Sequence, residues 1–233
     1  MAYRYKYGIP CLAIGSFYLC FIITCSILLI SYLKEKAQML KAGRLEIITG
    51  CMFSGKSEEL QRRARRALIA KGNVKLFKPS TDDRYDKTKI TSHSGQEISA
   101  IGISSNVPEL IYSYLNEANS ASGIYVIAID EIQFFHEKIV DLLKVFVVAG
   151  IRVIVAGLDT DYRRIPWEPV PTLMALANNV QKLHAICTFE DANGFICGEE
   201  ANCTQRITGG TERVVIGGKD KYEARCLDHH HIP

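Results

Sequence analysis

The sequence predicts an α/β fold in which helices flank a parallel sheet, followed by a small C-terminal domain. Short apolar segments alternate with helix-like segments between residues 45 and 156, and this alternation is typical of parallel sheets. Residues 124–129 form a continuous apolar run, as expected for a central strand that is buried on both faces. After about Leu183 the chain changes to short strand-like segments, glycines and cysteines, which indicates the smaller domain.

The elements of the larger domain follow from the hydrophobic pattern and from the residues that interrupt it. Strands are predicted over residues 45–49, 74–78, 124–129 and 152–156. Helices are predicted over residues 57–70, 107–118 and 137–149, and Gly72 and Gly150 fall where two of them should end. Residues 81–95 are polar and residues 158–171 are rich in proline, so both segments are expected to be irregular.

Composition excludes some classes of protein. Of 233 residues, 48% are hydrophobic and 23% are charged, which excludes a disordered chain and allows a substantial core. The formal net charge of +3 is too small to indicate nucleic-acid binding, so no nucleic-acid partner is expected.

The eight cysteines fall into separate groups along the chain. Three lie in an apolar N-terminal segment, Cys51 lies in a glycine-containing motif, and four lie near the C-terminus beside His229. Disulfides are rare in the cytosol, the compartment indicated by the glycine-containing motif described below. The C-terminal group is therefore interpreted as metal-binding.

The N-terminal segment over residues 9–33 has no charged side chain. A membrane-spanning helix needs about 20 such residues, and a signal peptide fits this long run less well. Three interpretations stay open: a membrane anchor, a buried or interfacial helix, or an extension upstream of a working start at Met39. If the segment spans a membrane, the basic residues that follow it keep the rest of the chain in the cytoplasm.

Residues 50–57 read GCMFSGKS and match the Walker A pattern in full. The glycines allow backbone N–H groups to surround phosphate oxygens, and the start of the following helix adds partial positive charge. In this pattern Lys56 reaches the outer phosphates and the Ser57 hydroxyl binds Mg²⁺. The motif lies between a predicted strand and a predicted helix, so it predicts a P-loop phosphotransferase.

Two acids, Asp130 and Glu131, directly follow the predicted strand 124–129. An acid at this place typically holds Mg²⁺ directly or through water. The second acid could activate water in a hydrolase or accept the proton of a substrate hydroxyl in a kinase. Phe134 and Phe135 come next and could either line a pocket for a flat base or pack in the core.

Taken together, the motifs resemble one family. After GCMFSGKS come DDRY (82–85), DEIQFF (130–135), GLDTDYRRIPW (157–167), KLHAIC (182–187), TQR (204–206) and VIGGKDKYEARC (215–226). In this order they resemble type II thymidine kinases, the tetrameric, zinc-containing class. The resemblance runs from about Gly43 to the end of the chain.

The resemblance implies a P-loop (RecA-like) parallel sheet with flanking helices, plus a small zinc-ribbon-like domain that carries a lasso loop. It divides the chain into an N-terminal segment (1–42), a kinase domain (43–182) and a zinc-binding and lasso domain (183–233). It also implies ATP-dependent phosphorylation of the 5′-hydroxyl of thymidine, and of deoxyuridine, in pyrimidine deoxynucleoside salvage. ATP, Mg²⁺ and structural Zn²⁺ are the implied cofactors. The implied state is a cytoplasmic homotetramer that is inhibited by thymidine triphosphate.

The resemblance assigns the phosphate-transfer machinery residue by residue. Glu131 corresponds to the general base, with Lys56 and Arg84 as further catalytic residues. The family's Mg²⁺-binding positions correspond to Ser57, Asp82 and Asp130. The implied nucleotide-binding residues are Gly50, Cys51, Met52, Phe53, Ser54, Gly55, Lys56, Ser57, Asp130, Glu131, Ile132 and Gln133.

The resemblance also assigns an acceptor pocket. An apolar and aromatic lining and backbone groups of the lasso loop are implied to hold the base, while a tyrosine approaches the sugar. The corresponding residues are Met52, Phe134, Leu158, Tyr162, Trp167, Thr204, Val214, Val215, Ile216, Gly217 and Tyr222.

The sequence departs from the family in its first cysteine pair. The family has Cys-x2-Cys there, whereas this chain has Cys187-x9-Cys197. A two-residue spacer presents two thiolates to one ion, and a nine-residue spacer does not enforce that geometry locally. We expect zinc on Cys187, Cys197, Cys226 and His229. Replacement of one cysteine by Cys203 or Glu190, or buried thiols without metal, are alternatives.

Two other functions compete with the kinase. One is a P-loop ATPase or nucleotide-binding regulator, in which Glu131 would activate water. The other is a membrane-tethered, inactive homologue that only binds nucleotide. The base-pocket motifs argue against the first, since an ATPase needs no such pocket, and the complete phosphate loop and acid pair argue against the second.

Overall fold

The structure is a computed structural model that describes residues 43–70, 72–80, 89–91, 97–114 and 125–232. The chain divides into two compact units, Met1–Lys41 and Ala42–Pro233, and the second contains all of the described residues. The apolar segment 9–33, Met39, Asp82 and Arg84 lie outside the described residues. No helix within the described ranges is both long and apolar enough to cross a membrane.

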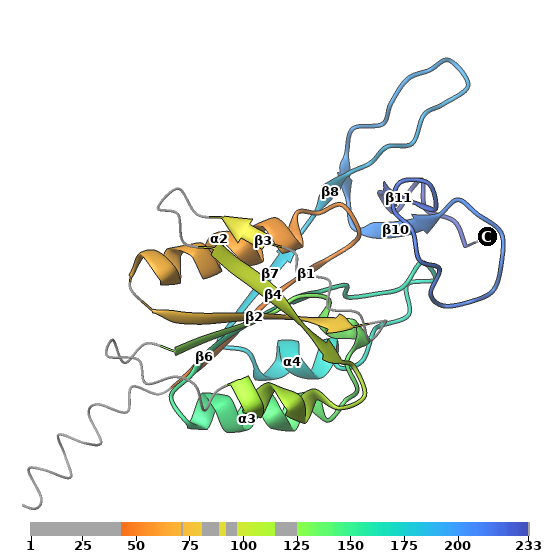
Figure 1. The fold of residues 1–233 in the computed structure, drawn as a ribbon. Coiled ribbons are helices and arrows are strands. Elements are labelled where there is room, and N and C mark those ends of the chain that lie inside the picture. The colour runs from red at the N-terminus through yellow and green to blue at the C-terminus, as the bar shows by residue number, and fades with distance from the viewer. Residues whose placement is uncertain (1–42, 71, 81–88, 92–96, 115–124, 233) are drawn as a thin grey trace, which may run out of the picture. The chain divides into compact units, whose positions relative to one another are not determined.

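A seven-stranded sheet forms the centre of the second unit (Figure 1), with the strand order β3-β4-β2-β5-β6-β1-β7. All neighbouring strands run parallel except β3, which is antiparallel to β4. The predicted α/β class is therefore confirmed. The strands are β1 (Arg44–Gly50), β2 (Asn73–Ser80), β3 (Lys89–Thr91), β4 (Glu97–Ser104), β5 (Tyr125–Ile129), β6 (Arg152–Gly157) and β7 (Asn179–Leu183).

Helices cover both faces of this sheet (Figure 1). Helix α2 (Lys56–Ile69) packs on one face through Leu60, Ala64 and Ala67, which lie on one side of the helix because they are spaced by four and three residues. Helices α3 (Ile139–Val148) and α4 (Val170–Leu176) cover the opposite face.

Alternate side chains of the central strands enter the two cores. Ile47 packs with α3 and α4, whereas its neighbour Ile48 packs with α2. Both side chains are fully buried, as the period of two requires in a strand that is covered on both faces.

The carboxyl ends of β1, β5 and β6 meet at one edge of the sheet. Thr49 is level with Gly157, and Ile129 is level with Val155. The hydroxyl of Thr49 donates to the carbonyl of Gly157 at 3.1 Å. The segments that follow these strands therefore begin side by side, at the edge where α/β proteins bind ligands.

Two small antiparallel sheets follow the main sheet. One pairs β8 (Ala185–Ile186) with β9 (Glu200–Ala201), and the other pairs β10 (Cys203–Arg206) with β11 (Tyr222–Arg225). Residues 207–221, here named the β10–β11 loop, connect the second pair. This part contains the predicted metal ligands, and the division near residue 183 stays a prediction.

Several local predictions were wrong or incomplete. Residues 89–91, expected to be irregular, form the edge strand β3, and strands β4 and β7 and helix α4 were not predicted. The helix predicted over 107–118 is a 3₁₀ helix, Pro108–Tyr114, and residues 115–118 are not among those described. A second 3₁₀ helix, Ile132–Phe134, follows the acid pair.

Candidate active site and metal cluster

The phosphate loop connects β1 to α2, and two of its glycines adopt backbone conformations that other residues rarely adopt. Gly50 has a φ of 140°, and a Cβ atom there would lie 2.1 Å from the carbonyl oxygen of Leu183. Gly55 has a φ of 80° and caps the start of α2. Both positions require glycine, since a side chain would clash at the first and be strained at the second.

Lys56 opens α2 and folds back over the loop. Its Nζ donates to the Cys51 carbonyl oxygen at 2.6 Å and lies 3.5 Å from the Ser54 hydroxyl. Burial lowers the pKa of Lys56, and the nearby carboxylate of Glu131 partly opposes this. The ammonium group is thus held among phosphate-loop atoms, where it can bind a phosphate oxygen.

Asp130 leaves the end of β5 beside the start of α2. Its backbone N–H donates to the Phe77 carbonyl at 2.8 Å. Burial and the charge of Glu131 raise the pKa of Asp130 to about 6, while a hydrogen bond with the Ser57 side chain acts in the opposite direction. Ser57 and Asp130, both predicted to bind Mg²⁺, therefore lie together.

Glu131 adopts an uncommon backbone conformation. Its φ of 52° and ψ of 43° are left-handed, a region that residues other than glycine occupy rarely and often at functional sites. Its N–H donates to Asp130 Oδ1 at 3.0 Å. The turn directs the two consecutive carboxylates to different partners.

Gln133 orients Glu131, a role that no sequence motif indicates. Its side-chain amide donates to Glu131 Oε2 at 2.6 Å, and its Oε1 accepts from the N–H of Leu158 at 3.0 Å. A Cβ at Gly157 would lie 2.5 Å from this Oε1. Gln133 is buried, so it joins the acid pair to the segment after β6, and only a glycine at 157 leaves room for this contact.

Four residues of the predicted acceptor pocket lie in the segments that follow the acid pair and β6. Phe134 contacts Trp167 edge-to-face, with the ring centroids 5.8 Å apart. Leu158 is joined to the same region through Gln133. Tyr162 is buried, and its hydroxyl lies 3.5 Å from the carbonyl of Thr211 in the β10–β11 loop.

The C-terminal part contacts the phosphate loop, and its β10–β11 loop is bonded to β11. The Thr204 hydroxyl accepts from the N–H of Met52 at 3.1 Å, which places two predicted acceptor-site residues together. The Tyr222 hydroxyl bonds both the N–H and the carbonyl of Val215, each at 3.1 Å. Val214 and Ile216 are exposed on the same loop.

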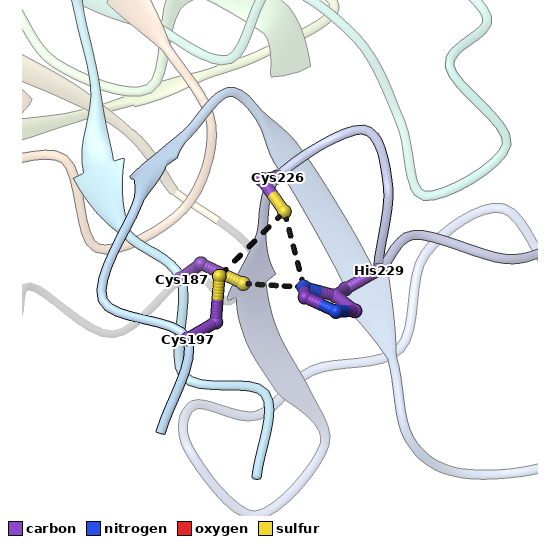
Figure 2. Close-up of side chains that lie close together, drawn as sticks. All are labelled: Cys187, Cys197, Cys226 and His229. Atoms are coloured by element: carbon purple, nitrogen blue, oxygen red, sulfur yellow. Dashed lines mark hydrogen bonds between the residues drawn. The ribbon is translucent and has the colours of Figure 1, made fainter. Parts of the chain in front are cut away.

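Four predicted metal ligands converge near the C-terminus (Figure 2). The ligand atoms of Cys187, Cys197, Cys226 and His229 all lie within 4.8 Å of one another. The Sγ atoms of Cys197 and Cys226 are 4.0 Å apart, and His229 Nδ1 lies 3.2 Å from Cys226 Sγ. A tetrahedral zinc ion with bonds of about 2.0–2.3 Å separates its ligand atoms by about 3.5–3.8 Å, so this donor set fits one ion.

The alternative ligands do not join this cluster. The Cys203 thiol instead donates to the Asn202 side chain at 3.2 Å, and Glu190 lies in the hairpin that connects Cys187 to Cys197. Within the described part of the chain, the Cys₃His set is the group with metal-ligating geometry.

The nine-residue spacer forms a hairpin that projects beyond β8 (Figure 1). Cys187 N–H donates to the Glu199 carbonyl at 2.8 Å, and Cys197 N–H donates to the Phe189 carbonyl at 2.9 Å. At its tip, Asp191 Oδ1 accepts from the N–H groups of Asn193 and Phe195. The nine-residue spacer therefore closes through hydrogen bonds of its own hairpin, which return Cys197 to Cys187.

Backbone donors also act on the cysteine thiols. Burial raises the pKa of Cys187, but the N–H groups of Cys226 and Phe189 and the side chain of His229 outweigh it and lower this pKa to about 7. A thiol that ionises near neutral pH is suited to metal binding, since the thiolate is the ligand.

Comparison with known protein families agrees with the geometry. The family model described as thymidine kinase matches residues 43–230, which include the phosphate loop, the acid pair, the β10–β11 loop and the four clustered ligands. The match begins after the apolar segment 9–33. The thymidine kinase family implies nucleoside and nucleotide substrates. The chain therefore belongs to the thymidine kinase family and is a kinase.

Proposed function

We propose that this protein transfers the terminal phosphate of ATP to the 5′-hydroxyl of thymidine, with deoxyuridine as a second substrate. The observation that carries the proposal is the Gln133 contact, at 2.6 Å, which holds Glu131 at the edge of the sheet where the phosphate loop begins. A carboxylate fixed in this place can accept the hydroxyl proton as the oxygen attacks phosphorus. The products are thymidine monophosphate and ADP.

The donor half of the site is built from the phosphate loop and its neighbours. Lys56 binds the outer phosphates and offsets charge that develops on the transferred group. Ser57 and Asp130 would hold Mg²⁺, with Asp82 as a third ligand and Arg84 as a further cation. Mg²⁺ supplies charge neutralisation of the phosphates when it is bound.

The acceptor half would lie against Phe134, Trp167 and Leu158. Aromatic rings at this place favour a flat base and exclude larger ones by bulk. Met52 and Thr204 join the two halves through their hydrogen bond at 3.1 Å. The remaining acceptor contacts would come from Tyr162, Tyr222 and residues 214–217.

The Cys₃His cluster would hold structural zinc. Four protein ligands close the coordination shell, as in structural rather than catalytic zinc sites. The ion would fix the start of the β8–β9 hairpin to the end of β11. It would thereby support the β10–β11 loop, which we propose covers the acceptor.

Three further properties are proposed on the family resemblance: a homotetrameric assembly, inhibition by thymidine triphosphate, and a place in cytoplasmic pyrimidine deoxynucleoside salvage. These three properties do not depend on the role of residues 9–33. If residues 9–33 act as an anchor, the protein would be attached to a membrane.

The competing function is a P-loop ATPase or nucleotide-binding regulator. The full chain, incubated with γ-labelled ATP and Mg²⁺, should release little phosphate alone and should label thymidine when thymidine is added. Phosphate release at the same rate with and without thymidine, with no labelled nucleotide, would assign the ATPase instead. Deoxyuridine and a purine deoxynucleoside test the range of acceptors.

A further inference from the structure

One arginine makes several contacts between the β10–β11 loop and residues 158–167. Arg213 lies in the middle of the loop, and its Nε is 3.0 Å from Asp161 Oδ2. Its Nη2 donates to the Pro166 carbonyl at 2.7 Å. Its guanidinium carbon lies 3.9 Å from the centroid of the Trp167 ring. One side chain therefore makes an ion pair, a backbone hydrogen bond and a cation–π contact with the same segment.

Asp161, the acid of this ion pair, is oriented by hydrogen bonds within its own turn. The Asp161 side chain is only 1% exposed, and its Oδ1 accepts from the N–H groups of Arg163 and Ile165, both at 2.9 Å. The second oxygen, Oδ2, lies 3.0 Å from Arg213 and 3.6 Å from Arg163. Because Asp161 is buried and already oriented, the ion pair should contribute more than an exposed pair of mobile side chains.

The third contact leads to the proposed reaction centre. Trp167 carries Arg213 over its ring and touches Phe134 with a ring centroid distance of 5.8 Å. Phe134 follows the acid pair by three residues. The position of Arg213 is thus tied to the aromatic lining against which the acceptor nucleoside would lie.

A second arginine, Arg206, fixes the base of the same loop in a different way. It is 1% exposed, donates to the Gly210 carbonyl and the Tyr222 hydroxyl, and lies 4.2 Å from the Tyr162 ring centroid. This side chain is part of the core and cannot separate without local unfolding. The Arg213 side chain is 38% exposed, so its contacts can break and reform while the core stays intact.

We propose that Arg213 is a positioning residue that latches the β10–β11 loop onto residues 158–167 and so sets how firmly the acceptor nucleoside is held. The inference rests on the proposed function for its kinetic consequence, whereas the latch itself is a property of the loop. Release of the latch lets the loop open for nucleoside entry and product exit.

Arg213→Met tests the latch, because methionine keeps an apolar side chain over Trp167 but removes the charge and the donors. Amide hydrogen exchange in residues 207–221 should become about tenfold faster, and exchange in β5 and β6 should not change. The KM for thymidine should rise about tenfold with kcat within about threefold, since the loop holds the substrate and does not perform the chemistry.

Arg163→Met is the matched control. Arg163 lies 3.6 Å from the same Asp161 oxygen and 5.4 Å from the Tyr162 ring centroid, but it belongs to the segment that receives the latch. Its loss should leave both the exchange of residues 207–221 and the KM for thymidine unchanged. Equal effects of the two variants would show a general electrostatic change and would overturn the proposal.

Asp161→Asn completes a double-mutant cycle. Asparagine can still accept the two N–H bonds of the turn through Oδ1, but it loses the charge that faces Arg213. The double variant should exchange no faster than Arg213→Met alone. Additive effects, or unchanged loop exchange in Arg213→Met, would overturn the latch. If the wild-type enzyme fails to phosphorylate thymidine, the proposed function falls, and the exchange measurements still decide the latch.

Discussion

Asp130 is a partly buried acid whose charge opposes folding. Its pKa is raised from 3.8 to about 6, so the folded state holds this proton more tightly than the unfolded chain does. Ionisation therefore destabilises the fold above pH 6, and the penalty disappears as the pH falls from 6 towards 4. A carboxylate kept at such a cost is expected to serve a ligand, and here that ligand would be Mg²⁺.

Asp130→Asn should stabilise the protein while abolishing phosphate transfer. Without added Mg²⁺ the free energy of unfolding should rise by about 2–3 kcal/mol at pH 8 and by about half as much at pH 5. Denaturant unfolding at the two pH values measures this difference. Asp141→Asn, at an acid whose side chain is 84% exposed, is the control and should change stability by less than about 0.5 kcal/mol. A stabilisation that grows at lower pH would contradict the assignment.

Gln133 is the second residue whose role follows from contacts. Gln133→Leu should lower kcat about 10–100-fold with little change in the KM for ATP, because Glu131 loses its orienting donor but the phosphate loop is untouched. The N–H of Leu158 also loses its acceptor, which should cost about 1–3 kcal/mol in unfolding experiments. Steady-state kinetics decide the matter: a loss confined to the KM for ATP would contradict the orienting role.

Motifs name candidate residues for a donor site because the chemistry fixes both residue type and spacing. Gly50, Gly55, Lys56, Asp130 and Glu131 could all be found in this way. Gln133 was predicted only as a nucleotide-binding residue, and Asp161, Arg206 and Arg213 were not predicted. Their roles depend on contacts between segments that are distant in the sequence, and no local pattern records such contacts.

At the scale of elements, the hairpin between Cys187 and Cys197 also orients one of the clustered ligands, His229. Its Phe189 ring stacks on the His229 imidazole, with centroids 4.1 Å apart and an interplanar angle of 10°. The guanidinium of Arg225 lies 4.9 Å from the Phe189 ring centroid. The stack fixes the imidazole in the orientation that brings Nδ1 towards the Cys226 and Cys187 thiols.

Phe189→Ala should therefore weaken retention of the zinc ion that we propose for this cluster. Zinc should pass to a chromogenic chelator about tenfold faster than from the wild-type protein, as is common when a residue that orients a metal ligand is lost. Phe195→Ala is the matched control, since Phe195 belongs to the same hairpin and is 72% exposed. Equal rates for the two variants would show that the stack does not orient His229.

The failure to predict one strand has a clear physical cause. Strand β7, Asn179–Leu183, lies at the edge of the sheet and is largely exposed, so it carries no continuous apolar run. It pairs with β1 over five positions, and that pairing is a tertiary interaction. Central strands such as β5 were predictable because burial on both faces requires apolar residues throughout.

At the scale of the whole molecule, the Cys₃His cluster and the phosphate loop share one core. Cys51 packs with Cys187, Cys226 and Ala201, and its thiol donates to the Ala201 carbonyl at 3.2 Å. With the bond between Met52 and Thr204, this places two consecutive phosphate-loop residues against the C-terminal part. The cluster therefore supports both halves of the proposed site.

Removal of the metal should accordingly weaken nucleotide binding as well as acceptor binding. After treatment with a chelator, the Kd for ADP should rise about three- to tenfold, and the melting temperature should fall. Titration calorimetry and thermal unfolding measure the two effects, and added zinc should restore both. An unchanged Kd with a lowered melting temperature would show that the cluster stabilises the fold without supporting the phosphate loop.

The central claim is that Glu131 is the base of a kinase that phosphorylates thymidine. The most direct test compares the wild-type chain with Glu131→Gln and with Glu137→Gln, an exposed acid six residues away, in the transfer of label from ATP to thymidine. We predict that Glu131→Gln loses at least about 10³-fold in kcat and keeps its affinity for ADP, whereas Glu137→Gln is unchanged. Near-normal formation of thymidine monophosphate by Glu131→Gln would contradict the account.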